Sequence, residues 1–314
     1  MPWRFAVNHQ GINCVNSENT MLNSKNFIHP EDEAALRNLE VIPGLPTVVK
    51  GFLKLGYEKL QHGINMASKI RLSPTQLPEI YRRLPPICQK MGIAEPEFYL
   101  EMSPVPNAYT FGDTQVFIVV TSGLLEYLDD DEIDSVIAHE CGHIACRHVL
   151  YHTIATMILN GADALGVLGV LTKPVEYAFL YWMRKSELSA DRAAALVMGA
   201  DEVVKTHVRL AGGPKAITAG INLDEWGKQA DKYEEIYNDG AWNKTLQLFV
   251  IKDQTHPFSA VRVREILRWA ETEQYTTLRA ALERGGTDND NACPVCQQPV
   301  ADGWAFCKHC GAKL

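Results

Sequence analysis

The chain has 314 residues, 46% of them hydrophobic and 22% charged, so it can bury a large core and is not an intrinsically disordered protein. Thirty Lys and Arg face 38 Asp and Glu, for a net charge of −8 and with no basic run, which excludes nucleic acid as an expected partner. The opening MPWRFAVNHQ lacks the apolar stretch of a signal peptide. We therefore expect a cytoplasmic protein.

The first part of the chain predicts helices behind a polar, Asn-rich arm. Pro30 followed by two acidic residues is typical of a helix start, and apolar residues at helical spacing continue to Leu39. Helical periodicity resumes at 48–67 and at 77–91, where Pro85-Pro86 is expected to interrupt it. We assign residues 1–69 to an N-terminal arm with helices.

A small sheet is predicted next, followed by many helices. Aromatic and β-branched runs indicate strands at 97–102, 107–113 and 116–120. Three Asp residues at 129–131 favour the start of a helix over 130–152. Further apolar or helical stretches lie at 154–171, 175–183, 187–198, 223–237, 242–251 and 261–282. The fold class is α+β and mainly α, with a main domain over 70–284, a linker at 285–292 and a separate module at 293–314.

The stretch 154–171 is 18 residues long, close to the length of a membrane span. It contains Asn160, Asp163 and three glycines, and a central Asp costs a few kcal/mol on insertion scales. A buried helical hairpin is the favoured interpretation. Peripheral membrane contact through residues 154–183 is the alternative.

The predicted helix 130–152 carries the motif H-E-x-x-H. His139 and His143 are four residues apart and share one helix face, so both can reach one metal ion. Glu140 is offset by one residue, beside the open coordination position, where a carboxylate can take a proton from water. A chance match is the alternative, and the amphipathic, acid-capped helix argues against it.

A hydrolytic zinc site needs three protein ligands, and the two histidines supply only two of them. Glu187 and Asp191 are four residues apart in E-L-S-A-D, and the alanines at 190 and 193–195 let their helix approach the first one closely. We predict Glu187 as the third ligand and Asp191 as the acceptor of the free N–H of a zinc-bound His. Taken alone, the pair is also typical of a solvated helix face.

These motifs together resemble the HtpX-like and CAAX-prenyl-protease-like zinc endopeptidases, metallopeptidase family forty-eight. The resemblance rests on HECGH at 139–143, ELSAD at 187–191, NAYTFG at 107–112 ahead of QVFIVV, and HPFSAVR at 256–262. In order and spacing these cover roughly residues 70–270. The chain departs from the membrane members, which have clear transmembrane spans, and is closer to the soluble ones.

The resemblance implies a zincin-type, gluzincin domain with a small sheet beside the active-site helix. It implies His139, His143 and Glu187 as zinc ligands and Glu140 as catalytic base. Asp191 maps onto a residue with a proton-donor or supporting role. Arg262 is expected to pair with an acid such as Asp191. His256 is expected to stabilise the oxyanion or to fill the open zinc position at rest; the alternative for His256-Pro257 is a helix start without a chemical role.

The mechanism implied by the resemblance needs a place for an extended peptide. The edge of the small sheet can pair with a peptide main chain by strand addition, and such pairing is largely independent of side-chain identity. The substrate-binding residues predicted there are Asn107, Ala108, Tyr109, Thr110, Phe111 and Gly112.

The C-terminal module contains two C-x-x-C pairs separated by ten residues: Cys293, Cys296, Cys307 and Cys310. This spacing indicates a zinc ribbon that holds one structural zinc, additional to the catalytic one, and that folds only with metal. A redox-active dithiol pair is the alternative. A site closed by four cysteines is not catalytic, so we expect a docking or regulatory module with an unidentified partner.

Three functions remain open from the sequence. The leading one is a zinc endopeptidase acting on proteins or peptides, with protein quality control as its setting. The second is a chaperone-like or adaptor protein that binds unfolded chains with little proteolysis; the intact Glu140 argues against it. The third is a metallohydrolase of small substrates, which only substrate testing separates from the first.

Overall fold

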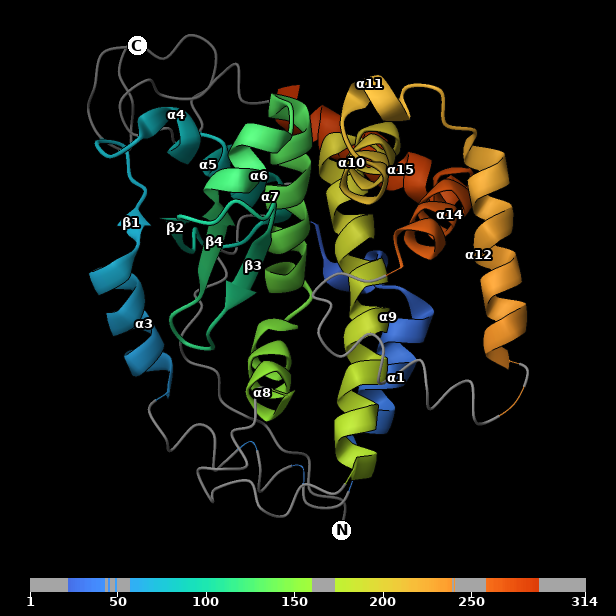
Figure 1. Cartoon of the computed structure of the whole chain (residues 1–314), viewed down its shortest axis with the longest axis horizontal. Helices are drawn as coiled ribbons and strands as arrows, with labels where there is room; N and C mark the ends of the chain where they lie inside the picture. The colour runs from blue at the N-terminus through green and yellow to red at the C-terminus, as the bar shows by residue number, and fades with distance from the viewer. Residues whose placement is uncertain are drawn as a thin grey trace, which may run out of the picture.

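The computed structural model describes residues 22–42, 45, 49, 57–159, 173–238, 240 and 258–287. Two long helices, α7 (Asp130–Ala145) and α9 (Lys173–Met198), run side by side through its middle (Figure 1). A small sheet lies on one side of this pair, and α12 (Leu223–Asn238) and α14 (Ser259–Ala270) lie on the other. The predicted mainly helical fold with a small sheet is confirmed.

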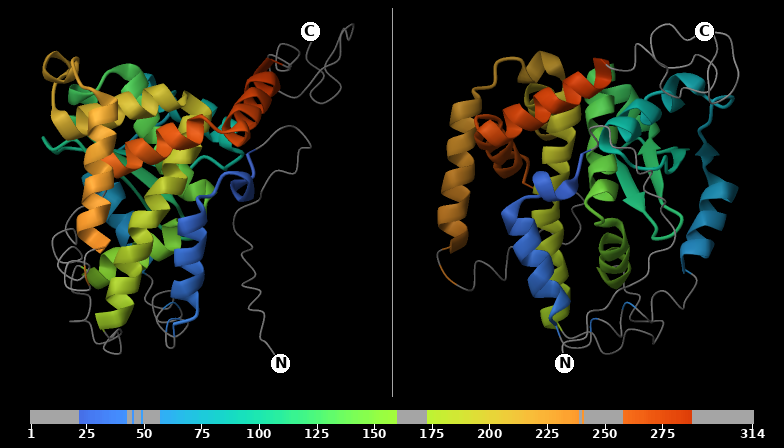
Figure 2. Two further views of the ribbon diagram at one scale, coloured as in Figure 1. Left: turned by 90° about the vertical axis from the view of Figure 1, so that its right-hand side faces the viewer. Right: turned by 180° about the vertical axis from the view of Figure 1, so that it is seen from behind.

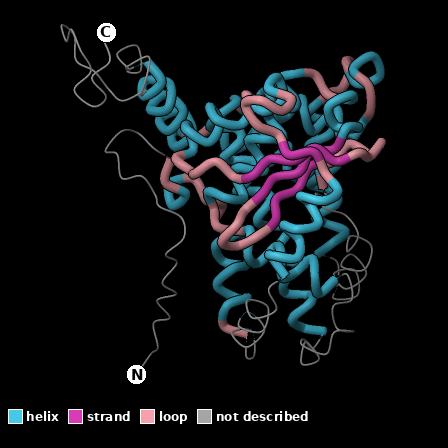
Figure 3. Tube along the Cα trace, turned by 90° about the vertical axis from the view of Figure 1, so that its left-hand side faces the viewer, coloured by secondary structure: helices cyan, strands magenta, loops and turns pink. Residues whose placement is uncertain are grey.

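The sheet has four strands in the order β1-β2-β4-β3 (Figure 3). The predicted strands form as β2 (Glu97–Glu101), β3 (Ala108–Phe111) and β4 (Phe117–Thr121). Strand β2 runs parallel to β4, with Tyr99 opposite Val119, and β3 runs antiparallel to it, with Thr110 opposite Ile118. The two-residue β1 (Ile70–Arg71) was not predicted, because so short a strand has no sequence periodicity.

The two faces of the sheet are both covered. Phe98, Ile118 and Val120 point into the main core, which also contains apolar residues of α7 and α9. The alternate residues Tyr99 and Val119 form a separate cluster on the opposite face, towards α3 (Tyr57–Ser68). Because both faces are covered, β4 is buried along its whole length and is apolar from Phe117 to Val120, as its β-branched sequence indicates.

Helix α7 begins as predicted but ends early. The Asp129 side chain caps it, and Glu132 completes a capping box. The prediction of one helix over 130–152 is wrong: α7 ends at Ala145, and α8 (Val149–Leu159) follows as a separate helix. Arg147 has a left-handed φ of 62°, and the His148 N–H donates to the His143 carbonyl while the Arg147 N–H donates to the Ile144 carbonyl. This helix-ending motif usually has Gly at the left-handed position. Because Arg147 stands there instead, the end of the helix was not recognisable from the sequence.

Helix α9 is one continuous helix of 26 residues, where the sequence predicts separate stretches at 175–183 and 187–198. It packs closely on α7 at Gly142, where an added Cβ would lie 2.9 Å from the Ala190 carbonyl oxygen and 2.9 Å from the Ala193 Cβ. The expected role of the small residues of α9 is therefore confirmed. Only Gly on α7 and Ala on α9 allow this separation.

Helix α10 (Ala200–Gly212) was missed by the sequence analysis. It starts after Gly199, whose φ of 99° turns the chain away from α9, and it packs against α7, α9 and α14. It buries Val203, Val204 and His207 against these helices. Both sides of the turn at Gly199 look helical in sequence, so its position was not evident.

The remaining helices agree with the predictions only in part. Helix α1 (Pro30–Glu40) begins at the predicted Pro30 and lies along α9 (Figure 2). Pro85 and Pro86 do not interrupt a helix but lie in the first turn of α5 (Leu84–Met91), which tolerates Pro. The single helix predicted over 261–282 is two helices, α14 and α15 (Glu273–Thr287). The other short elements are η1 (Ser24–Asn26), α4 (Pro78–Tyr81), α6 (Ser122–Tyr127) and α11 (Lys215–Thr218).

Several predicted features lie outside the described residues. They are most of the stretch 154–171, the helix 242–251, most of the linker 285–292 and the four-cysteine module 293–314. Within the described ranges, none of the helices combines the length and the apolar character needed to cross a bilayer.

Candidate metal centre

The H-E-x-x-H motif lies in the second half of α7, deep in the molecule. His139, Glu140 and His143 are all buried, and Glu140 is only 1% exposed. The two imidazoles lie on one face of the helix, with their Nε2 atoms 3.2 Å apart. The predicted convergence of two ring nitrogens on one point is present.

Glu187 reaches the same point from α9. Its Oε2 lies 3.3 Å from His139 Nε2, and its Oε1 lies 3.3 Å from His143 Nε2. One donor atom from each of the three side chains lies within 4.8 Å of the others. Two neutral imidazoles and one carboxylate are the donor set of a hydrolytic zinc site, so these residues fit zinc.

Asp191, one turn after Glu187, is held by three basic side chains. Its Oδ1 lies 2.9 Å from His139 Nδ1 and 3.3 Å from His207 Nε2 of α10. Arg262 of α14 donates from Nε to Oδ2 at 2.7 Å and from Nη2 to Oδ1 at 2.6 Å. The predicted contacts of Asp191 with a ligand histidine and with Arg262 are therefore present. The participation of His207 was missed, because α10 was not predicted.

Charge around Asp191 controls the protonation of the centre. Burial alone would raise the pKa of Asp191, but the charges of Arg262 and His207 and the hydrogen bonds from Arg262 and His139 hold it well below its ordinary value. Burial disfavours the charged imidazole of His139, yet the hydrogen bonds with Asp191 and Glu187 raise its pKa to about 9.

The two ligand histidines differ in their surroundings. Burial lowers the pKa of His143, despite its contact with Glu187. Arg262 links the two carboxylates of the centre, because its Nη1 also lies 3.0 Å from Glu187 Oε2. These carboxylates raise the pKa of the buried guanidinium, so Arg262 is a permanent cation behind the ligands.

Glu140 is hydrogen-bonded to the sheet. The Thr110 hydroxyl, on the edge strand β3, donates to Glu140 Oε2 at 2.6 Å. Of the predicted substrate-binding residues, Ala108–Phe111 form this strand, and Thr110 contacts the Glu140 carboxylate. Asn107 and Gly112 flank it, anchored by backbone N–H bonds to Thr121 and Thr153. The Thr110–Glu140 contact was not predicted.

Two further residues, His148 and Asp32, lie next to the metal centre. His148 Nδ1 lies 3.1 Å from His143 Nδ1, and His148 Nε2 lies 3.0 Å from Asp32 Oδ2 of α1. The sequence analysis did not identify either residue. The H-x-x-x-H spacing of His148 and His152 was the available signal. His256 and the four cysteines of the C-terminal module lie outside the described residues.

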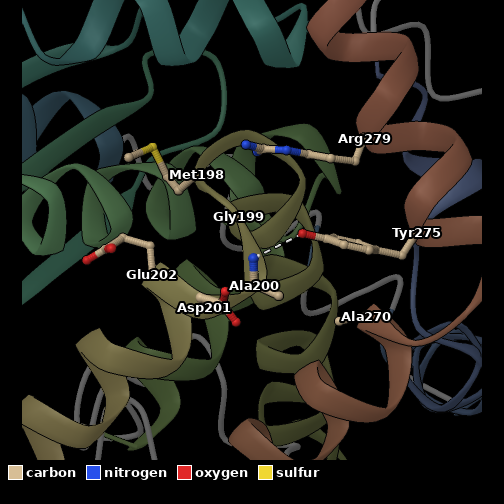
Figure 4. Close-up of a pocket in the computed structure, with 8 residues that line it drawn as sticks. All are labelled: Met198, Gly199, Ala200, Asp201, Glu202, Ala270, Tyr275 and Arg279. Atoms are coloured by element: carbon tan, nitrogen blue, oxygen red, sulfur yellow. Dashed lines mark hydrogen bonds between the residues drawn. The ribbon is translucent and has the colours of Figure 1, made fainter.

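Two hollows lie near these helices but neither opens onto the three ligands. A pocket of about 350 Å³ lies between the end of α9, the start of α10 and α15, where the Ala200 N–H donates to the Tyr275 hydroxyl at 3.0 Å (Figure 4). A small hollow behind the centre is lined by Asp191, Arg262 and residues of α1, α9 and α14. No predicted site residue lines the first pocket.

The chain is similar to known metallopeptidases over most of its length. The sequence profile of peptidase family M48 matches residues 74–270. The plastoglobule-localized metallopeptidase 48 of Arabidopsis thaliana chloroplasts is 33% identical over 274 residues, 85% of this chain and 78% of that protein.

Bacterial and archaeal relatives are more distant. The protease HtpX homologue of Ralstonia pickettii is 24% identical over 242 residues, 68% of this chain and 81% of that protein. That of Pyrococcus furiosus is 25% identical over 219 residues, 62% of this chain and 70% of that protein. No solved structure matches the chain significantly.

Proposed function

The chain belongs to peptidase family M48 and is a metalloprotease, and we propose that it hydrolyses internal peptide bonds of proteins with a zinc ion held by His139, His143 and Glu187. One observation carries the proposal: three ligand atoms of the right kinds converge within 4.8 Å, and the buried Glu140 directly follows the first of them. Bound zinc supplies Lewis acidity, which polarises a carbonyl group and lowers the pKa of water.

Glu140 is the general base of the proposed reaction. Its carboxylate takes a proton from the attacking water and returns it to the nitrogen of the leaving amine. The Thr110 hydroxyl holds Oε2 at 2.6 Å and so orients the carboxylate. Because both residues are part of rigid elements, a helix and a paired strand, the base is positioned before substrate arrives.

Asp191 and Arg262 support the ligands in this proposal. Asp191 accepts the Nδ1–H of His139, which directs His139 Nε2 towards Glu187. Arg262 stabilises the charge of both carboxylates. His256, six residues before Arg262 in sequence, is proposed to stabilise the oxyanion or to occupy the open zinc position at rest.

We propose that peptide substrates lie along the edge of the sheet at Asn107–Gly112. Strand β3 is one of the two edge strands of the described sheet, and Thr110 links it directly to Glu140. A peptide paired with this strand passes close to the base. Main-chain pairing suits unfolded protein segments of many sequences, which supports a role in protein quality control.

Wider assignments rest mainly on the sequence. We propose a structural zinc on Cys293, Cys296, Cys307 and Cys310 and a docking partner for this module. Because α15 continues to Thr287, the linker predicted at 285–292 is proposed only for the residues after this helix. Localisation is proposed as cytoplasmic, with 154–171 as part of a buried helical hairpin and peripheral membrane contact through 154–183 as the alternative.

Degradation of casein tests the proposal. Zinc-loaded wild type is compared with Glu140→Gln, and zinc per chain is counted by mass spectrometry. We expect cleavage by the wild type, none by Glu140→Gln, and two zinc ions in both. Zinc retained without cleavage by the wild type would favour the chaperone-like alternative. Cleavage of small peptides without casein would indicate a metallohydrolase of small substrates.

A further inference from the structure

His143 is contacted on both sides of its ring. Its Nε2 faces Glu187 and the Nε2 of His139, which leaves Nδ1 on the opposite side. That Nδ1 lies 3.1 Å from His148 Nδ1, and His148 is fully buried. His148 is held in place by the motif that ends α7, because its backbone N–H donates to the His143 carbonyl at 2.9 Å.

The other nitrogen of His148 leads to a buried carboxylate from a distant part of the chain. Asp32, in the first turn of α1, is 0% exposed. Its Oδ2 lies 3.0 Å from His148 Nε2 and accepts the Ser189 hydroxyl at 2.5 Å, and its Oδ1 accepts the Trp182 indole N–H at 3.0 Å. A buried carboxylate that accepts two hydrogen bonds can hold a fixed position.

His143, His148 and Asp32 form a row of polar groups. Only one arrangement of protons suits this row when His143 is a ligand. A His143 that binds metal through Nε2 carries its proton on Nδ1, and that N–H donates to Nδ1 of His148. His148 then carries its proton on Nε2, which lies 3.0 Å from Asp32 Oδ2 without the alignment of a hydrogen bond, so the carboxylate acts on this ring through its charge.

We infer that Asp32 and His148 are positioning residues for the ligand His143, so that helix α1 completes the metal centre. The inference rests on the proposed zinc site. It gives His143 a counterpart of the contact between His139 and Asp191, with one imidazole inserted between ligand and carboxylate. Helix α1 lies outside the matched M48 segment, 74–270, so family membership alone does not supply this contact.

Ser189 connects Asp32, which contacts His148, to the part of α9 that carries Glu187 and Asp191. It lies between Glu187 and Asp191 on α9, and its hydroxyl both donates to Asp32 and accepts the His29 backbone N–H at 2.9 Å. The start of α1 is thus attached to the same turn of α9 that carries Glu187. Displacement of α1 would move both Asp32 and this turn.

Zinc affinity of the full-length protein, measured by competition with a chromogenic chelator, tests the inference. The variant Glu187→Ala keeps the cysteine module. The zinc bound by wild type minus the zinc bound by this variant is therefore the zinc of the catalytic site. His148→Phe keeps ring shape but removes both nitrogens, and we expect it to weaken catalytic-site zinc binding by about 10–100-fold. Asp32→Asn removes the charge and should weaken it less. His148→Asn retains an acceptor near Nδ1 and should recover part of the affinity.

A matched control is His152→Gln. His152 packs on His143 but hydrogen-bonds to Ser186, outside the row, so its replacement should leave zinc affinity at the wild-type value. The visible spectrum of the cobalt-substituted proteins reports ligand geometry independently of activity, and we expect it to change in His148→Phe and not in His152→Gln. Melting temperatures of the metal-free variants separate positioning from a general loss of stability.

Two results would overturn the inference. Wild-type zinc affinity and an unchanged cobalt spectrum in His148→Phe would show that the row has no positioning role, while the proposed zinc site would stand. A metal equivalent lost in His152→Gln and His148→Phe but kept in Glu187→Ala would show that the three histidines bind a separate ion. If wild type and Glu187→Ala bind the same amount of zinc, it is the proposed function that fails.

Discussion

Arg262 donates two parallel hydrogen bonds to Asp191, one of 2.7 Å from Nε to Oδ2 and one of 2.6 Å from Nη2 to Oδ1. The two residues are 71 positions apart, on α14 and α9, and both are buried. A planar guanidinium matches a carboxylate in this geometry, which a Lys ammonium cannot reproduce. The pair therefore connects the late H-P-x-x-x-x-R segment to the turn that carries Glu187.

Replacement of Arg262 by Gln should strongly destabilise the protein. It leaves the Asp191 charge buried without its main cation, which costs about 3–5 kcal/mol of the free energy of unfolding in comparable buried pairs. Urea unfolding at neutral pH measures the loss. The control Arg268→Gln, on the same helix but 58% exposed, should change stability by less than about 0.5 kcal/mol. Equal stability of both variants would contradict the assigned role of Arg262.

Replacement of Thr110 by Val should slow catalysis without removing zinc. Val keeps the shape of Thr but cannot donate to Glu140 Oε2, so the base loses its orientation. We expect kcat to fall on the order of tenfold to a hundredfold, with little change in KM. Thr110→Ser restores the hydroxyl and should recover most of kcat. A Val variant with wild-type kcat would show that Thr110 does not orient the base.

Replacement of Gly142 by Ala should destabilise the protein although Ala favours helices. The new methyl group would lie 2.9 Å from the Ala190 carbonyl oxygen and force α7 and α9 apart, at a cost of about 1–3 kcal/mol. Gly63→Ala, in α3 with open space around the added methyl, should instead stabilise by up to about 1 kcal/mol. Thermal unfolding of the two variants beside wild type measures both signs.

The stability contributed by Glu265 should depend on pH in the acid range. Contact with the His29 imidazole, 3.7 Å away, and the adjacent Arg264 lower the pKa of Glu265 from 4.5 to about 2. A lowered carboxyl pKa stabilises the folded state above the unfolded value, and this stabilisation is lost as the pH falls through the folded value. The contribution, at most about 3 kcal/mol, is therefore complete above pH 4.5 and fades towards pH 2.

Comparison of wild type with Glu265→Gln isolates this contribution. The variant should be less stable than wild type at pH 6, and the difference between their free energies of unfolding should shrink steadily between pH 4.5 and the lowest pH at which both stay folded. A difference that is constant across this range would show that the charge of Glu265 does not stabilise the fold.

The proposed metal ligands and the main elements around them were evident from the sequence by itself. His139 and His143, like Glu187 and Asp191, are related by a spacing of four residues, which a helix converts directly into a shared face. The acidic cap of α7, the Pro that starts α1 and the β-branched run of β4 are equally local. Local signals of this kind depend only on neighbours in the chain, so they can be recognised without a structure.

Only the tertiary structure decided which other groups surround the ligands. Asp32 is separated from His148 by 116 positions, His207 comes from a helix that the sequence did not reveal, and Thr110 comes from the sheet edge. The tertiary structure also decided where α7 ends, because packing holds Arg147, a residue other than Gly, in the left-handed region. These contacts arise where separate elements bury polar groups together. Each such group needs a partner out of reach of water, and the chain path, rather than sequence spacing, determines which residue provides it.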